Sequence, residues 1–168
     1  MANPHLLTGL GSALAVSLSC LGAAIPSSVA ATYAMQTKGY LSHVPIIVSG
    51  VLGIYGVIIA VLLVGKLQGE MEAIRGYMNL SAGLAVGLSC LASGVGMANF
   101  LTDSLYGYPN LARRRVTSVQ TEPLLSTTEA TLAVKGPQPV NLKFFFMLTF
   151  LEALGLYGLI VALFLIGK

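Results

Sequence analysis

The chain has 168 residues, of which 55% are hydrophobic and only 9% are charged. Soluble domains carry about 25% charged residues, so this composition excludes a water-soluble domain and predicts an integral membrane protein. The net charge is +3, but the basic residues lie beside apolar stretches, which argues against a nucleic-acid partner. The two cysteines, Cys20 and Cys90, lie inside apolar stretches and form no metal-binding or disulfide motif, so both are expected to be buried thiols.

Four apolar stretches are each long enough to cross the ~30 Å hydrocarbon core of a bilayer as a helix. Backbone groups in hydrocarbon must be hydrogen-bonded within their own segment, so helices are the expected structure. The predicted fold class is therefore all-α, a multi-pass membrane protein with four transmembrane helices. The predicted spans cover, in chain order, residues 6–35, 44–65, 77–101 and 140–167.

The first span follows an N-terminal stretch, MANPHLL, that lacks the basic residues of a cleaved signal peptide. We therefore expect it to be retained as a membrane helix. Pro26 removes a backbone donor inside this span and is expected to bend or loosen the helix. Pro45 stands at the start of the second span, where proline fits the first helical turn.

The first and third spans are rich in small residues and align without gaps from Ser12/Ala82 to Leu21/Leu91. Small residues let two helix backbones approach closely. We therefore predict that these two helices form the tightly packed side of the molecule, which in a ring would be the inner wall. The candidate helix-packing residues are Gly9, Ala13, Ser17, Gly83 and Gly87.

The second and fourth spans also match each other. VLGIYGVIIAVLLVGK from Val51 aligns with ALGLYGLIVALFLIGK from Ala153. The chain is thus predicted to be two duplicated helical hairpins, residues 1–70 and residues 71–168. A unit of two membrane helices returns the chain to the side of the membrane where it began. The two copies therefore have the same orientation and are parallel repeats. Parallel repeats suit a ring or array, although they also occur in alternating-access carriers.

A long polar segment, residues 102–139, connects the third and fourth spans and contains Arg113, Arg114 and Arg115. Segments of this length without periodicity are usually disordered or specialised. This loop and the loop between the first two spans hold most of the lysines and arginines. The positive-inside rule therefore predicts that both loops are cytosolic and both termini lumenal.

Glu152 interrupts the fourth span eight residues, or about 12 Å, after Phe144, near the bilayer midplane. A carboxylate there costs roughly 2.5–3.5 kcal/mol, which predicts a proton- or cation-binding role rather than a folding role. The repeat places Gly50 opposite it, so one carboxylate remains per four helices. We expect Thr149, Gly155 and Tyr157 to support the carboxyl group.

The kind of ion can be narrowed from the sequence. Sodium sites need several oxygen ligands beside the carboxylate, and a glutamine within the membrane often supplies one of them. The four glutamines all lie outside the centres of the spans: Gln36, Gln68, Gln120 and Gln138. A proton is therefore the favoured ion, and no metal or cofactor is expected.

These residues together resemble the proteolipid subunit c of eukaryotic vacuolar-type proton-translocating ATPases. The resemblance covers all four spans in order and depends on GSALAVSLSCLGAA, PIIVSGVLGIYGVIIAVL, LSAGLAVGLSCLASG and, most specifically, FLEALGLYGLIVAL. It implies a homo-oligomeric or mixed proteolipid ring, turned by a cytosolic ATPase through central-stalk subunits and surrounded by lipid. It also implies that Glu152 is the proton-binding residue, passing an arginine of subunit a between two aqueous half-channels.

The same resemblance implies a subunit of acidic organelles that is not itself an enzyme. No GxxxxGK[ST] phosphate-binding loop occurs in the chain, so ATP hydrolysis is expected in other subunits. The long loop at residues 102–139 departs from the family pattern, as does Pro26.

Three alternatives stay open at this point. A related paralogue, c-double-prime, carries its carboxylate in an earlier helix, where this chain has Gly50. A structural tetraspan or junctional scaffold would explain the small residues but not Glu152. A stand-alone secondary carrier predicts a monomer or dimer with a central substrate pocket.

Overall fold

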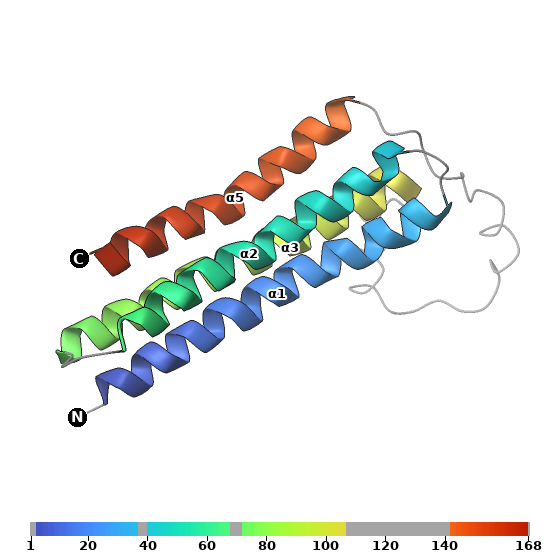
Figure 1. Cartoon of the computed structure of the whole chain (residues 1–168). Coiled ribbons are helices and arrows are strands. Elements are labelled where there is room, and N and C mark those ends of the chain that lie inside the picture. The colour runs from blue at the N-terminus through green and yellow to red at the C-terminus, as the bar shows by residue number, and fades with distance from the viewer. Residues whose placement is uncertain (1–2, 37–39, 68–71, 107–141, 168) are drawn as a thin grey trace, which may run out of the picture.

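A computed structural model describes residues 3–36, 40–67, 72–106 and 142–167. Nearly all of them lie in helices, and the described part of the chain contains no strand (Figure 1). Four of the helices are long and apolar enough to cross a membrane, which confirms the predicted all-α, four-span fold class. The elements are α1 (Pro4–Gln36), the short 3-10 helix η1 (Tyr40–His43), α2 (Val44–Gly65), α3 (Ala73–Tyr106) and α5 (Leu142–Gly167).

The ends of the helices differ from the predicted spans mainly in α3. We expected a span over residues 77–101, but the helix covers Ala73–Tyr106, so residues 102–106 belong to α3 and not to the loop. A membrane helix can continue beyond the hydrocarbon core of the bilayer, because polar side chains at its ends are solvated there. Hydropathy alone therefore does not locate the end of the helix. The rest of the predicted loop, residues 107–139, lies outside the described residues.

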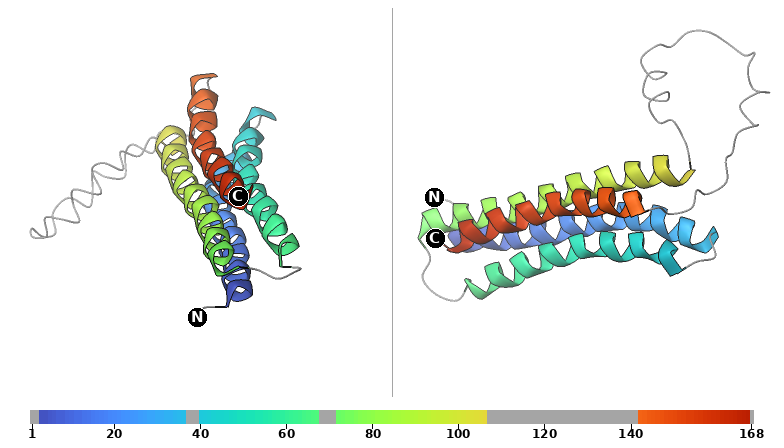
Figure 2. Two further views of the ribbon diagram at one scale, coloured as in Figure 1. Left: turned by 90° about the vertical axis from the view of Figure 1, so that its left-hand side faces the viewer. Right: turned by 90° about the horizontal axis from the view of Figure 1, so that it is seen from above.

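The four long helices form an up-and-down bundle in which helices that follow one another in the chain are antiparallel (Figure 1). Both termini therefore lie at the same end of the bundle, as the two views of Figure 2 also show. α1 and α3 form the most extensive contact, α2 packs chiefly on α1, and α5 packs chiefly on α3. The contact between α2 and α5 is much smaller.

Glycines explain why α1 and α3 lie so close together. A Cβ on Gly83 would overlap the carbonyl group of Gly11, and a Cβ on Gly94 would overlap that of Gly22. Both clashes are with backbone, which cannot move aside as a flexible side chain can. The α1–α3 contact thus requires residues without side chains at these positions.

The two hairpins pack in the same way. In the first hairpin, a Cβ on Gly56 of α2 would overlap Ser19 and the carbonyl oxygen of Ala15 in α1. In the second hairpin, a Cβ on Gly158 of α5 would overlap Ser89 of α3. Gly158 and Ser89 are the counterparts of Gly56 and Ser19 in the aligned repeat. The same helix-to-helix contact therefore occurs twice.

Pro26 lies buried inside α1, which is one helix from Pro4 to Gln36. Proline lacks the N–H that would bond the carbonyl of Gly22, and that carbonyl faces Gly94 of α3. One residue further on, the hydroxyl of Ser27 donates to the carbonyl of Ala23 at 2.7 Å. The proline is thus accommodated at the α1–α3 contact without ending the helix.

Candidate functional site

Glu152 lies in the middle of α5, partly buried where α5 faces α2. The hydroxyl of Tyr55, a buried residue of α2, donates a hydrogen bond to Oε1 of Glu152. The two helices run in the same direction, and their contact is smaller than the contact within either hairpin. This hydrogen bond therefore joins the two halves of the chain at the level of the carboxyl group.

The backbone beside Glu152 is fixed to α3. The hydroxyl of Ser93, on α3, donates to the carbonyl oxygen of Leu151 at 2.5 Å. Ser93 is 1% exposed, so this hydrogen bond is shielded from any competing solvent. The residue next to the carboxyl group is thus anchored to α3, which fixes the depth of Glu152 in the bundle.

Gly155 lies on the buried side of α5, one turn after Glu152. A Cβ there would approach the Leu52 side chain to 2.5 Å and the Cys90 sulfur to 3.7 Å. The absence of a side chain thus lets α5 lie against both α2 and α3 at this level. Gly155 thus permits close helix packing one turn from Glu152, and its predicted support of the carboxyl group stays a prediction.

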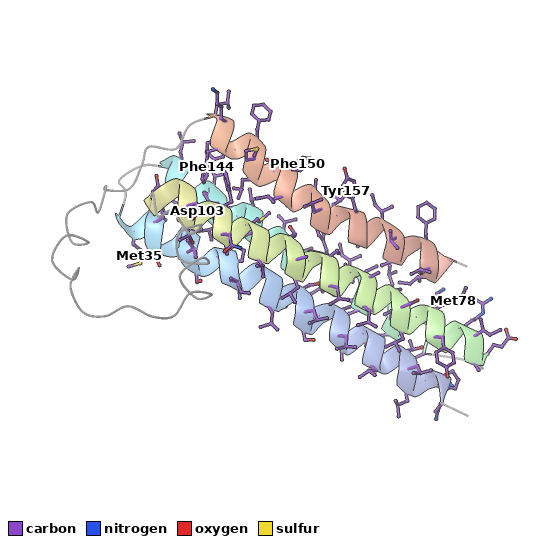
Figure 3. All side chains as sticks on the ribbon, turned by 180° about the vertical axis from the view of Figure 1, so that it is seen from behind. Met35, Met78, Asp103, Phe144, Phe150 and Tyr157 are labelled. Atoms are coloured by element: carbon purple, nitrogen blue, oxygen red, sulfur yellow. The ribbon has the colours of Figure 1, made fainter. Side chains whose placement is uncertain are left out.

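The other two predicted supporting residues lie elsewhere. The hydroxyl of Thr149 is exposed and donates to the carbonyl of Phe145 in its own helix at 2.9 Å. Tyr157 is 58% exposed, and its side chain projects from α5 away from the bundle (Figure 3). Because an α-helix has 3.6 residues per turn, side chains five residues apart point to different faces, so Tyr157 does not lie beside Glu152.

Sequence reasoning missed Tyr55, Ser93 and Lys66. The signal for Tyr55 was present, because the aligned repeat pairs Tyr55 with Tyr157. The prediction assigned the tyrosine on the same helix as Glu152, whereas the structure uses its counterpart on α2. No sequence pattern indicated Ser93, since a serine in a small-residue helix resembles a packing residue.

A second hydrogen bond between α2 and α5 lies near the ends of these helices. The ammonium group of Lys66, which follows the last residue of α2, donates to the carbonyl of Ile166 in the last turn of α5. The last four carbonyls of a helix have no partner within it, and a cation there also interacts favourably with the helix dipole. Lys66 thus holds the end of α5 against α2.

The predicted helix-packing residues divide into two groups. Gly83 and Gly87 lie in the α1–α3 contact, where Gly83 faces Gly11. A Cβ added at Gly9 would meet nothing from another helix within 4 Å, and Ala13 and Ser17 are exposed. For the second group, a role in helix packing stays a prediction.

The cysteines also differ from each other. Cys90 is buried close to the hydroxyls of Ser19 and Ser89, as expected of a structural thiol. Cys20 is exposed, contrary to the expectation that both would be buried. Among the described residues, no three His, Cys, Asp or Glu side chains lie close enough together to hold a metal ion.

The chain is similar along almost its whole length to known proteolipid subunits. It is 34% identical over 166 residues to the V-type proton ATPase subunit c' of Candida glabrata, an alignment that covers 94% of this chain and 85% of the relative. It is 33% identical over 163 residues to the subunit c' of Saccharomyces cerevisiae, with 92% and 84% covered.

The third comparison is with the V-type proton ATPase 16 kDa proteolipid subunit c of Homo sapiens. The two are 31% identical over 165 residues, covering 95% of this chain and 90% of the human protein. No protein-family model matches the chain. Identity above 30% over nearly the full length of these relatives shows that the chain belongs to the family of V-type proton ATPase proteolipid subunits.

Proposed function

We propose that this chain is a proton-carrying subunit of the rotor ring of a vacuolar-type ATPase, with Glu152 as the proton-binding residue. Copies of the chain, alone or mixed with related proteolipids, form the ring. Central-stalk subunits on the cytosolic side turn it, and other subunits hydrolyse ATP. The complex acidifies the lumen of an organelle such as a vacuole or lysosome, with the termini of the chain lumenal.

The observation that carries this proposal is the contact between Tyr55 and Glu152. It gives the one acidic side chain in the middle of a described membrane helix a hydrogen-bond donor from a different helix. A neutral carboxyl group can remain in hydrocarbon at a much smaller cost than a carboxylate. A protonated Glu152 can carry its proton on the other carboxyl oxygen while Oε1 accepts the hydrogen bond of Tyr55, so the contact is compatible with a holding state that travels through the lipid with its proton.

Release of the proton follows from a change of surroundings. When the ring brings Glu152 opposite an arginine of the stationary subunit a and an aqueous half-channel, the opposite charge and the water favour the ionised form. For this to happen, the carboxyl group turns away from Tyr55. Ser93 meanwhile keeps the backbone of α5 in place through Leu151, so that only the side chain has to move.

A proton suits this site better than sodium. Sodium needs several oxygen ligands, and among the described residues the hydrogen-bonding partner of the Glu152 carboxyl group is the single hydroxyl of Tyr55. A proton needs only the carboxylate oxygen. The geometry thus supports proton transfer in and out of one carboxyl group.

Carbodiimide labelling tests the proposal directly. Dicyclohexylcarbodiimide reacts with protonated carboxyl groups in apolar surroundings, so the assembled ring should be modified at Glu152, as read by mass spectrometry of peptides. Glu72, which is exposed just before α3, provides the matched control. Glu152→Gln should abolish labelling and Glu72→Gln should leave it unchanged.

Labelling spread over several carboxyl groups, or labelling that persists in Glu152→Gln, would contradict the role of Glu152. A structural tetraspan scaffold without transport predicts that Glu152→Gln leaves acidification intact. Rings must be shown to assemble in each variant, because lost assembly would remove labelling for an unrelated reason. Native mass spectrometry of the ring supplies that control.

A further inference from the structure

A hollow in the surface of α5 lies next to a fixed positive charge. Both α2 and α5 end at the end of the bundle where the termini lie (Figure 1). There the ammonium group of Lys66 donates to the carbonyl oxygen of Ile166. The next residue, Gly167, lines a hollow of about 430 Å³. The cation therefore lies at the edge of this hollow.

The hollow is apolar and shallow in the membrane. Its described lining carries no hydrogen-bonding side chain and consists of Ile160, Leu163, Phe164 and Gly167. These residues extend over about 10.5 Å of the helix axis, which is less than half of the ~30 Å hydrocarbon core. The volume lies in the ~300–1,000 Å³ range of pockets that hold small molecules. The hollow thus suits a hydrocarbon chain from a single leaflet of the bilayer.

The side chain of Lys66 is held in place although it is exposed. A lysine that is already fixed by a hydrogen bond loses less rotamer freedom on binding an anion than a free lysine does. The ammonium group has three N–H groups, so two remain for an anion when one donates to Ile166. The charge of Lys66 also offsets the partial negative charge at the C-terminal end of α5, which would otherwise repel an anion.

The edge of the hollow nearest to Lys66 is open. Gly167 is exposed, and a Cβ added there would meet nothing from another helix within 4 Å. Because Gly167 has no side chain, nothing at this position separates the hollow from the ammonium group. One molecule can therefore contact both.

The hollow and the cation together favour an amphiphilic ligand. Lysines at the ends of membrane helices lie at the level of the lipid headgroups. A phospholipid carries a hydrocarbon chain and a negative phosphate in one molecule, whereas a free phosphate ion would leave the apolar hollow empty. A transmembrane helix is ~10 Å across and spans both leaflets, so it would not be confined to this hollow.

We propose that this hollow binds one phospholipid, with an acyl chain against Ile160, Leu163 and Phe164 and its phosphate on Lys66. In the proposed topology this lipid belongs to the lumenal leaflet. The bound chain covers the surface of α5 that begins eight residues, or about 12 Å, after Glu152. The inference goes beyond the proposed function and does not depend on proton binding at Glu152.

Photolabelling in vesicles tests this site. The full-length protein in its native assembly is reconstituted into phosphatidylcholine vesicles that contain a small fraction of phosphatidic acid with a diazirine on one acyl chain. The matched probe is a diacylglycerol with the same two chains, which lacks only the phosphate. After irradiation, mass spectrometry of peptides locates the label.

Residues 160–167 should be labelled several-fold more by the phosphatidic acid than by the diacylglycerol, and inorganic phosphate in the buffer should not reduce this labelling. Equal labelling by the two probes, or labelling spread evenly over the exposed face of α5, would overturn the inference. Competition by inorganic phosphate would show that Lys66 binds a free anion instead. Labelling that appears only after the assembly is dissociated would show that another protein covers the hollow.

Two substitutions separate the headgroup from the chain. Lys66→Met should abolish the difference between the probes, whereas Lys66→Arg, which keeps the charge, should preserve it. Gly167→Leu fills the hollow from its open edge and should reduce labelling by both probes several-fold. Gly65→Leu is its matched control, because Gly65 is equally exposed and open at the same end of the bundle, and it should leave the labelling unchanged.

Undiminished labelling of Gly167→Leu would show that the acyl chain lies elsewhere and would contradict the inference. Carbodiimide labelling of Glu152 in the same variants reports separately on the proposed function. Lipid labelling without carbodiimide labelling would support the lipid site and contradict the role of Glu152. The reverse result would leave the proposed function standing and remove the lipid site.

Discussion

In the first hairpin, Gly50 leaves an open position on α2, whereas its counterpart in the second hairpin, Glu152, is held by a tyrosine from α2. The two hairpins otherwise pack alike, with Gly56 against Ser19 and Gly158 against Ser89. The glycine–serine contact thus occurs in both hairpins, whereas the carboxyl group occurs in one. The first hairpin shows that this helix contact forms without a carboxyl group at the corresponding position.

The serine that anchors α5 differs between the hairpins in the same way. Ser93 donates to the carbonyl of Leu151, whereas its counterpart in the first hairpin is Ala23, whose methyl side chain has no hydrogen to donate. The polar anchor thus occurs in the hairpin that has the acid. This pattern indicates that Ser93 serves the position of Glu152 more than the general packing of the hairpin.

The largest expected effect comes from filling the shared contact. Gly158→Val would place a side chain onto Ser89 and the carbonyl oxygen of Ala85, and Gly56→Val would do the same in the first hairpin. Overpacking of this kind costs about 1–3 kcal/mol or more where backbone cannot move. Both variants should lower the unfolding temperature in detergent strongly and by similar amounts.

Gly50→Val is the control for this prediction, because its Cβ meets no atom within 4 Å in the chain. It should leave the unfolding temperature of the isolated chain within a degree or two of the original. A loss as large as that of Gly158→Val would show that the outer face of α2 is packed within the chain. The two hairpins would then not be equivalent.

Tyr55→Phe separates the two tyrosines of the repeat. It removes the hydrogen bond to Glu152 and leaves the ring in place. A hydrogen bond worth about 1 kcal/mol corresponds to a change of roughly fivefold, so the carboxyl group should react with carbodiimide roughly fivefold faster. Tyr157→Phe should leave that rate unchanged, and an equal effect from the two variants would contradict the assignment of Tyr55 as the donor.

Ser93→Ala makes the second hairpin resemble the first at this position. The buried carbonyl of Leu151 loses its extra donor but keeps its place in the helix, so the cost should be about 0.5–1.5 kcal/mol. We expect a modest fall in unfolding temperature together with a changed carbodiimide rate at Glu152. Ala23→Ser, the reverse change in the first hairpin, should leave the rate at Glu152 unaltered.

Lys66→Met should have the smallest effect. It keeps the length of the side chain but removes the donor to the carbonyl of Ile166 and the charge at the end of α5, which together are worth about 0.5 kcal/mol because Lys66 is exposed. Differential scanning calorimetry of the purified ring should show a small fall in unfolding temperature. Lys143→Met, at the exposed start of α5, is the matched control and should show none.

The sequence was sufficient to predict the all-α fold and the four spans, because apolar length alone decides whether a helix crosses a membrane. It was less informative at the ends of α3, where the helix continues through polar residues such as Arg75 and Asp103. Charged residues are tolerated near the ends of a membrane helix, where they can reach water. An average of hydropathy along the chain therefore does not distinguish such a helix end from a loop.

An isolated carboxyl group inside an apolar span singles out Glu152 as the candidate site, and its role stays a prediction. The neighbours of the carboxyl group could not be predicted from the sequence. Which tyrosine contacts it depends on the relative rotation of α2 and α5, and helix packing across the bundle sets that rotation. The division of the small residues, with Gly83 inside the chain's own contact and Ala13 on its surface, depends on the same rotation of α1 and α3.

ATP-driven acidification of vesicles tests the central claim most directly. Complexes that contain Glu152→Gln, and matched complexes that contain Glu72→Gln, are reconstituted at equal ring content and followed with a pH-sensitive dye. Acidification should fall to background in the first and remain at the original rate in the second. A ring that contains Glu152→Gln in every copy and still acidifies the lumen would show that protons cross the membrane without this carboxyl group.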